Sequence, residues 1–147
     1  MNKQYVMDNF SLEGRKAIVT GAAQGMGRSI AEALHDAGAI VALVDYSASV
    51  KETARQMDET GKSVLPFQAD LSKREEIDRV FSEVMQAFDG HIDILVNNAG
   101  ISIEQPLNDM SIETWKQIID TNLNSVAVVI KAFLPIMIRR NSGNIVN

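Results

Sequence analysis

The sequence has no cysteine, few aromatic residues and no excess of positive charge. Without cysteine there are no disulfide bonds, thiolate zinc sites or cysteine nucleophiles, and the composition suits a reducing compartment, so we expect a cytoplasmic protein. The formal net charge of −5 provides no basic surface for nucleic acid or an anionic membrane. We therefore expect neither as a partner, and small molecules remain the class of ligand to consider.

Targeting segments and metal ligands are also lacking. The first ten residues have no basic region followed by an apolar core, so no secretory signal is predicted. The longest apolar stretch, 126–138, contains Lys131 and Pro135 and is too short to span a bilayer. His35 and His91 lie far apart without carboxylates at ligand spacing, so we predict no metal site.

Strand-like and helix-like segments alternate along the chain. Short apolar runs predict strands at 16–20, 40–44, 64–68, 94–96 and 143–147. Helical spacing predicts helices at 25–37, 49–59, after a capping box formed by Ser72 and Glu75, and from a cap at Ser111 to Ile138, with Trp115, Ile118 and Ile119 on a buried face. This alternation predicts one α/β domain, residues 1–147, with a parallel sheet and right-handed crossovers.

The most informative motif is the glycine-rich run at 20–27, TGAAQGMG, between the first strand and the first helix. Such a turn lets backbone N–H groups approach a pyrophosphate, and the helix N-terminus adds partial positive charge there. The motif therefore predicts dinucleotide binding.

A carboxylate follows the second strand. Asp45 lies about 18 residues after Gly27, close to the spacing of a carboxylate that binds the adenosine ribose. It would repel a 2′-phosphate, and the neighbouring positions Tyr46 and Gln24 offer no cation for one. This favours NAD over NADP as the cofactor. The alternative is that Asp45 only caps the next helix.

Two further clusters make the pattern specific. Asp70-Leu71 follows the third strand, and Asn97-Asn98-Ala99-Gly100 follows the fourth. Together with the T-G-x-x-x-G-x-G run, these motifs resemble the short-chain dehydrogenase/reductase family, in order and in register, from about residue 12 to the last. The resemblance implies a Rossmann-type doubly wound sheet of strand order 3-2-1-4-5, incomplete at its C-terminal side, with Pro66 on an edge strand.

The resemblance also implies roles for individual residues. The expected cofactor-binding residues are Gly21, Gln24, Gly25, Met26 and Gly27 in the turn, Asp45 and Tyr46 at the ribose, Asp70 and Leu71 beside the adenine, and Asn98, Ala99 and Gly100 flanking the cofactor. For the asparagines, turn formation is a second, compatible interpretation. Asn122 is similar to the family's active-site asparagine, which holds a water in the proton relay and breaks a helix locally; the alternative is a solvent-facing helical residue.

The family's catalytic serine and Tyr-x-x-x-Lys pair have no counterpart in these 147 residues. The tyrosines are Tyr5 and Tyr46, and the residues four positions later are Asn9 and Val50. We therefore expect the sequence to stop before these residues and this chain alone to be inactive.

The resemblance predicts that the parent protein is an NAD-dependent oxidoreductase that interconverts a secondary alcohol, such as a sugar alcohol, sugar acid or small hydroxy compound, and a ketone. The alternatives are a non-catalytic dinucleotide-binding module and a reductase of 3-oxoacyl thioesters, which usually prefers NADP. The almost wholly apolar helix from Leu123 to Ile138 is expected to pair across a homo-oligomer interface, as it commonly does in the family.

Overall fold

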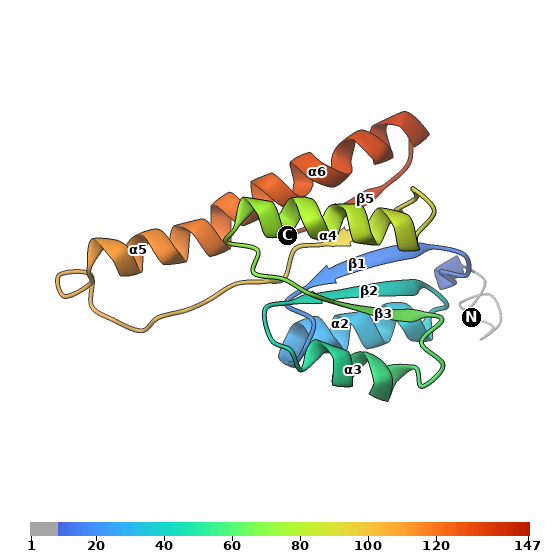
Figure 1. Ribbon diagram of the computed structural model, residues 1–147, viewed down its shortest axis with the longest axis horizontal. Helices are drawn as coiled ribbons and strands as arrows, with labels where there is room; N and C mark the ends of the chain where they lie inside the picture. The colour runs from blue at the N-terminus through green and yellow to red at the C-terminus, as the bar shows by residue number, and fades with distance from the viewer. Residues whose placement is uncertain (1–8) are drawn as a thin grey trace.

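Five parallel strands form the sheet of the computed structural model, which describes residues 9–147, in the order β3-β2-β1-β4-β5 (Figure 1). The strands are β1 Lys16–Thr20, β2 Ile40–Asp45, β3 Val64–Gln68, β4 Ile94–Val96 and β5 Asn144–Val146. The helices are α2 Gly25–Asp36, α3 Val50–Met57, α4 Arg74–Ala87, α5 Ile112–Ile119, the π-helical η1 Asp120–Asn124, and α6 Ser125–Arg140. The predicted α/β class and strand order are confirmed.

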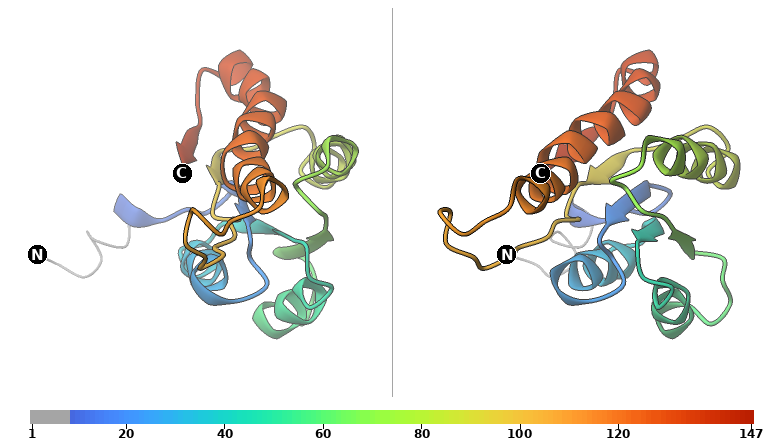
Figure 2. Two further views of the ribbon diagram at one scale, coloured as in Figure 1. Left: turned by 90° about the vertical axis from the view of Figure 1, so that its left-hand side faces the viewer. Right: turned by 60° about the vertical axis from the view of Figure 1, so that its left-hand side comes forward.

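The central strands are apolar because both faces of the sheet are covered. Along β1, Ile18 packs on the side of α4 and α6, whereas Ala17 and Val19 pack on the side of α2 and α3 (Figure 2). A strand buried on both sides needs a continuous apolar run instead of an alternating one. The edge position predicted for Pro66 is also confirmed, because within residues 9–147 the strand β3 pairs only with β2.

The helix predicted from Ser111 to Ile138 is continuous but changes form in the middle. Ser111 caps it as predicted, since its Oγ accepts a hydrogen bond from Thr114 N at 3.0 Å. After α5 the π-helical segment η1 leads into α6, and the run ends at Arg140, followed by Asn141 in the left-handed conformation (φ 49°).

The whole run Ile112–Arg140, 29 residues, is long and apolar enough to cross a membrane by length and composition alone. The expectation of a stretch too short to span a bilayer concerned residues 126–138, and the helix that contains them is longer than that stretch. The fold covers only part of this apolar run, since 28% of its apolar 18-residue window is buried. Val129, Phe133 and Ile136 of α6 pack into the core between the sheet and α4, where the rings of Phe133 and Phe81 lie 5.1 Å apart.

The N-terminal half of this run is more exposed than predicted. Trp115 is 47% exposed, α5 contributes no buried residue, and Ile118 and Ile119 are only half-buried. The prediction of a buried face there is wrong because α5 projects beyond the carboxyl ends of the strands, away from the sheet (Figure 1). Exposed apolar side chains continue onto η1 and α6 at Leu123, Leu134 and Ile138. That this surface pairs two copies of the chain stays a prediction.

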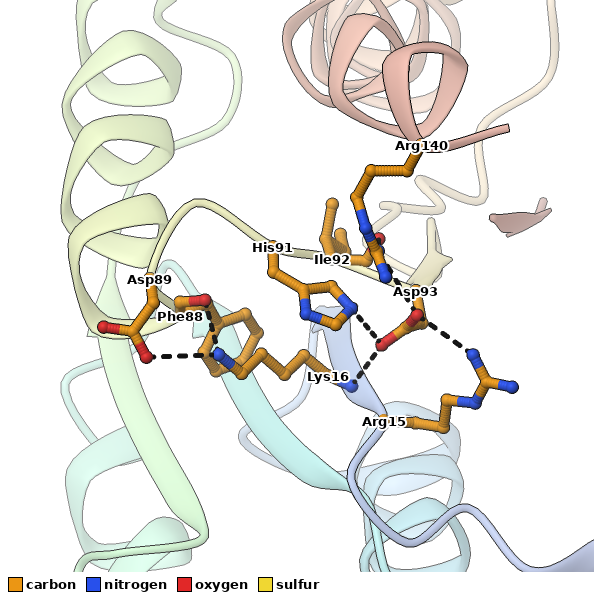
Figure 3. A network of polar contacts seen from close by, with 8 residues as sticks. All are labelled: Arg15, Lys16, Phe88, Asp89, His91, Ile92, Asp93 and Arg140. Atoms are coloured by element: carbon orange, nitrogen blue, oxygen red, sulfur yellow. Dashed lines mark hydrogen bonds and ion pairs between the residues drawn. The ribbon is translucent and has the colours of Figure 1, made fainter. Parts of the chain in front are cut away.

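At the opposite end of the strands, a buried carboxylate joins several elements (Figure 3). Asp93, 2% exposed, accepts hydrogen bonds from Lys16 N at 2.9 Å and from the guanidinium groups of Arg15 and Arg140 at 3.2 and 3.3 Å. Nε2 of His91 lies 2.8 Å from Asp93 Oδ2, at ion-pair distance although outside hydrogen-bond geometry. The carboxylate thus ties the start of β1 and the start of β4 to the end of α6.

The state of this carboxylate follows from two opposing effects. Burial by itself raises the pKa of Asp93, but the contacts with His91, the Lys16 amide and Arg15 outweigh burial and lower the pKa to about 2. Asp93 is therefore ionised at neutral pH and stabilises the folded state in that form.

We predict that Asp93→Asn lowers the free energy of unfolding at pH 7 by about 2 kcal/mol, the amount that corresponds to a pKa lowered from 3.8 to about 2. Because the folded-state pKa lies below the unfolded one, the wild-type advantage should be present above about pH 4 and fade as the pH falls toward 2. Urea unfolding at a series of pH values measures it.

Asp89→Asn is the matched control. Asp89 pairs with Lys16 at 3.4 Å, but its side chain is 91% exposed, so we expect little change in stability. An Asp93→Asn variant as stable as the wild type at pH 7 would contradict the assignment.

Candidate dinucleotide-binding site

The loops that follow β1, β2, β3 and β4 enclose a cavity of about 720 Å³ at the carboxyl edge of the sheet. Every residue predicted to bind the cofactor lines it, namely Gly21, Gln24, Gly25, Met26, Gly27, Asp45, Tyr46, Asp70, Leu71, Asn98, Ala99 and Gly100. The structure thus brings together all twelve residues from four separate loops. In parallel sheets this edge is where ligands bind.

Close packing fixes the glycine-rich turn. A Cβ atom on Gly27 would collide with the carbonyl oxygen of Gly21 and with the side chain of Asn98, so only glycine fits. At Gly25 the situation differs, because a Cβ there would meet nothing within 4 Å. Its φ of +58° nevertheless favours glycine, and the open space above it belongs to the cavity.

The turn leads into α2, which begins at Gly25 with Gln24 as its N-cap residue. The first backbone N–H groups of a helix have no partner within it, and they carry partial positive charge. Here they face the cavity, and because Gly25 has no side chain, a ligand can come close to the backbone. This arrangement suits a pyrophosphate.

Thr20 and Asn98 join the ends of β1 and β4 beneath the cavity. The buried Thr20 hydroxyl oxygen accepts hydrogen bonds from the backbone N–H groups of Asn98 and Ala99, both at 3.0 Å. In return, Asn98 Nδ2 donates to the carbonyl oxygens of Thr20 and Gly21 at 3.0 and 3.2 Å. Asn98 therefore holds the first glycine of the turn in place, which goes beyond local turn formation.

Asp45 ends β2 at the cavity wall. Its Oδ2 accepts from Ala23 N at 2.9 Å and its Oδ1 accepts from Ser47 N at 2.8 Å. The residue that caps α3 is Ser49, so the interpretation of Asp45 as a helix cap is wrong. Each carboxylate oxygen keeps a second lone pair, which leaves Asp45 able to accept hydrogen bonds from ribose hydroxyls.

Asp70 occupies the wall that follows β3. Hydrogen bonds from Ser72 Oγ, at 2.6 Å, and from Ser72 N lower its pKa, and Lys73 adds an ion pair at 3.3 Å. The capping box predicted at Ser72 and Glu75 does not form, because the Ser72 hydroxyl donates to the Asp70 carboxylate and Lys73 becomes the N-cap residue of α4.

Asn122 lies in η1, is exposed, and is not among the residues that line the cavity. Its Oδ1 accepts from Ile101 N and its Nδ2 donates to Ile101 O, both at 2.8 Å. This two-way pair ties the loop after β4 to the π-helical break in the α5–α6 run. The interpretation of Asn122 as a merely solvent-facing residue does not account for the pair. Its catalytic role stays a prediction.

Sequence reasoning missed five residues that line the cavity: Ala69, Ser72, Ile101, Gln117 and Thr121. The first three are chain neighbours of predicted residues. Gln117 and Thr121 lie four positions apart and so on one face of the α5–η1 run. The sequence carries no signal that this face meets the cavity, which only the folded structure shows.

Comparison with known proteins agrees with this geometry. A family model of the short chain dehydrogenases matches residues 15–147. The chain belongs to the short-chain dehydrogenase family. Its relatives in this family are dehydrogenases and other oxidoreductases.

Three relatives illustrate the range of the family. The 2-dehydro-3-deoxy-D-gluconate 5-dehydrogenase of Bacillus subtilis is 36% identical over 97% of this chain and 56% of its own length. A 3-oxoacyl-[acyl-carrier-protein] reductase of Staphylococcus epidermidis is 39% identical over 90% of this chain and 55% of its own. A crystal structure of a candidate NAD(P)-dependent gluconate 5-dehydrogenase from Beutenbergia cavernae, with NADP bound at low occupancy, has 36% identity and a TM-score of 0.84, over 92% of this chain and 54% of that one. The chain thus spans about half the length of these relatives.

We predict that Asn122→Ala loosens the loop after β4, because it removes both hydrogen bonds to Ile101. The expected cost is about 1 kcal/mol of stability, together with faster hydrogen exchange at the Ile101 amide. Hydrogen exchange of the Ile101 amide, measured by NMR in the wild type and the variant, tests this prediction.

Asn124→Ala is the control within η1, since Asn124 Nδ2 donates only to the exposed Asp120 side chain at 2.7 Å. It should leave the Ile101 amide unaffected. Equal protection of that amide in the wild type and in Asn122→Ala would refute the role of Asn122.

Proposed function

We propose that this chain is the cofactor-binding part of an NAD-dependent oxidoreductase that interconverts a secondary alcohol and a ketone. The observation that carries the proposal is that the glycine turn, Asp45 and the loop that contains Asn98 line one cavity. These three elements supply, in order, N–H donors for a pyrophosphate, acceptors for a ribose, and a rigid support between them.

The residues present fit a dinucleotide. The start of α2 offers backbone N–H groups, the open position at Gly25 admits phosphate oxygens, and Asp45 retains lone pairs for hydroxyl groups. Asp70 and Leu71 line the part of the cavity beyond Asp45, where the adenine would lie. When bound, the nicotinamide ring supplies the hydride acceptor or donor.

Charge favours NAD over NADP. A phosphate on the adenosine 2′-oxygen would face the carboxylate of Asp45, and Tyr46 and Gln24 provide no cation there. Arg28 is not among the residues that line the cavity, and it donates to Glu32 at 2.8 Å and to Gln56 at 3.1 Å. The NADP in the Beutenbergia structure is bound by that protein.

We predict that the chain binds NAD more tightly than NADP by about 2–3 kcal/mol, as expected when a carboxylate faces a phosphate and loses hydrogen bonds to hydroxyl groups. Asp45→Ser should narrow this difference. Isothermal titration calorimetry of both cofactors against the wild type and the variant measures it. If the wild type binds NADP more tightly than NAD, the proposed preference for NAD is wrong.

For the substrate, we propose a sugar acid or a related polyhydroxy compound. Two of the relatives are named as acting on gluconate or a deoxygluconate derivative, and the match covers nearly all of this chain. A second candidate is the reduction of 3-oxoacyl thioesters, which the 39% identity to the Staphylococcus epidermidis reductase favours. Asp45 argues against it, because such reductases usually prefer NADP.

The chain of 147 residues, on its own, is predicted to show no dehydrogenase activity. Neither Tyr5 nor Tyr46 is followed four residues later by lysine, so the acid/base pair that the family uses is not among these residues. NADH absorbance at 340 nm, followed with gluconate and with simple alcohols, should stay at background. Turnover that depends on both cofactor and chain would show that other residues replace the missing pair.

A further inference from the structure

The backbone of Ala23, in the middle of the glycine turn, is held on both sides by side chains from outside the turn. Its N–H donates to Asp45 Oδ2 at 2.9 Å, and its carbonyl oxygen accepts from Thr53 Oγ1 at 2.7 Å. Asp45 comes from the end of β2 and Thr53 from α3. One peptide segment is therefore fixed by two elements that are distant in the chain.

Thr53 is one of four buried polar residues among those that the structure describes, with 4% of its surface exposed. Ala23 is equally buried. If the donor to a buried carbonyl oxygen is removed, water cannot take its place, and the oxygen is left without a hydrogen bond. The turn therefore keeps this shape only with the hydrogen bond from Thr53. The sequence alone does not reveal this contact, because Thr53 is an ordinary residue inside a helix.

The position of Ala23 decides what the hydrogen bonds control. It directly precedes Gln24, the N-cap residue of α2, and Gly25, the glycine beneath the open part of the cavity. Fixing the Ala23 peptide therefore fixes where α2 begins and in which direction its unpaired N–H groups point.

We propose that Asp45 and Thr53 form a clamp on Ala23 that orients the glycine turn for the diphosphate of the cofactor, with Thr53 as a positioning residue that never touches the ligand. The inference rests on the proposed dinucleotide function. It gives Asp45 a second task besides discrimination at the ribose. Changing Asp45 therefore lowers the affinity for NAD and NADP alike, in addition to narrowing their ratio.

The clamp also indicates a position at which cofactor preference can be altered without removing either hydrogen bond to Ala23. Tyr46, 75% exposed, lines the same cavity, and its side chain takes no part in the contacts to Ala23. Tyr46→Arg adds a cation for a 2′-phosphate while leaving the clamp closed, so it should gain affinity for NADP without the general loss that Asp45 variants suffer.

The test uses the 147-residue chain and two probes, ADP-ribose, which contains the diphosphate, and AMP, which has one phosphate. Thr53→Val removes the hydroxyl at constant shape, and Thr53→Ser retains it. Ala54→Gly is the control, because it weakens the same buried stretch of α3 without touching Ala23. Should Thr53→Val fail to fold, Thr53→Ala, which also lacks the hydroxyl, is measured instead.

We expect Thr53→Val to weaken ADP-ribose binding by about tenfold or more and AMP binding by less, with Thr53→Ser near the wild type and Ala54→Gly within about twofold. The Ala23 amide should exchange faster in Thr53→Val, with no ligand present, and not in Ala54→Gly. This pattern supports the clamp.

Other outcomes overturn it. If Thr53→Val binds ADP-ribose within twofold of the wild type, or if Ala54→Gly loses as much affinity, the clamp does not position the turn. In both cases the wild type still binds, so the proposed function stands. If the wild type binds neither ADP-ribose nor NAD, the proposed function fails and the clamp fails with it.

Discussion

The close approach of the β1–α2 turn to the end of β4 is the constraint on which the rest of the site depends. Gly27 packs so tightly under the Gly21 carbonyl and the Asn98 side chain that no Cβ fits, and the Asn98 amide also donates to the carbonyl oxygens of Thr20 and Gly21. If this contact opened, the start of α2 would move away from the sheet. The N–H groups of α2, the carboxylate of Asp45 and the loop after β4 would then no longer face one cavity.

Polar groups are concentrated at the two ends of the central strands, and the middle is apolar. At the carboxyl end, the buried Thr20 hydroxyl joins β1 to the loop after β4. At the amino end, the Asp93 carboxylate joins the same two strands to α6. Both are buried, and both have partners that compensate for the water they lose. The strands between them are therefore held in register from both ends, and the cavity rests on a rigid frame.

Patterns local in sequence predicted most of the frame. Apolar runs located every strand and Pro66 identified the edge. Motif spacing pointed to the glycine turn and Asp45, the family resemblance supplied the other expected residues, and all twelve line the cavity. The predictions of strands and of the glycine turn are correct because strand burial and tight turns depend on residues that are close in the sequence. The fold order needed more than periodicity, since it came from the family that the motifs resemble.

The features that were predicted wrongly or not at all depend on side-chain contacts and packing that sequence periodicity does not show. A serine before a helix predicts a cap, yet the Ser72 hydroxyl donates to the Asp70 carboxylate, and this charge-assisted hydrogen bond orients the side chain toward Asp70. Trp115 has helical spacing typical of a buried face, but α5 extends beyond the sheet and the side chain stays 47% exposed. The roles of Thr53, Gln117 and Asp93 likewise exist only once the chain is folded.

The most direct test of this account is an NMR titration of the ¹⁵N-labelled chain with NAD, which reports at each backbone amide where the ligand binds. The account predicts the largest shifts at the amides of Gly25 and Met26, with further shifts at Tyr46, Leu71 and Ala99, and little change along α6. Shifts confined to α6 or the amino ends of the strands would contradict it, as would the absence of any shift at millimolar NAD.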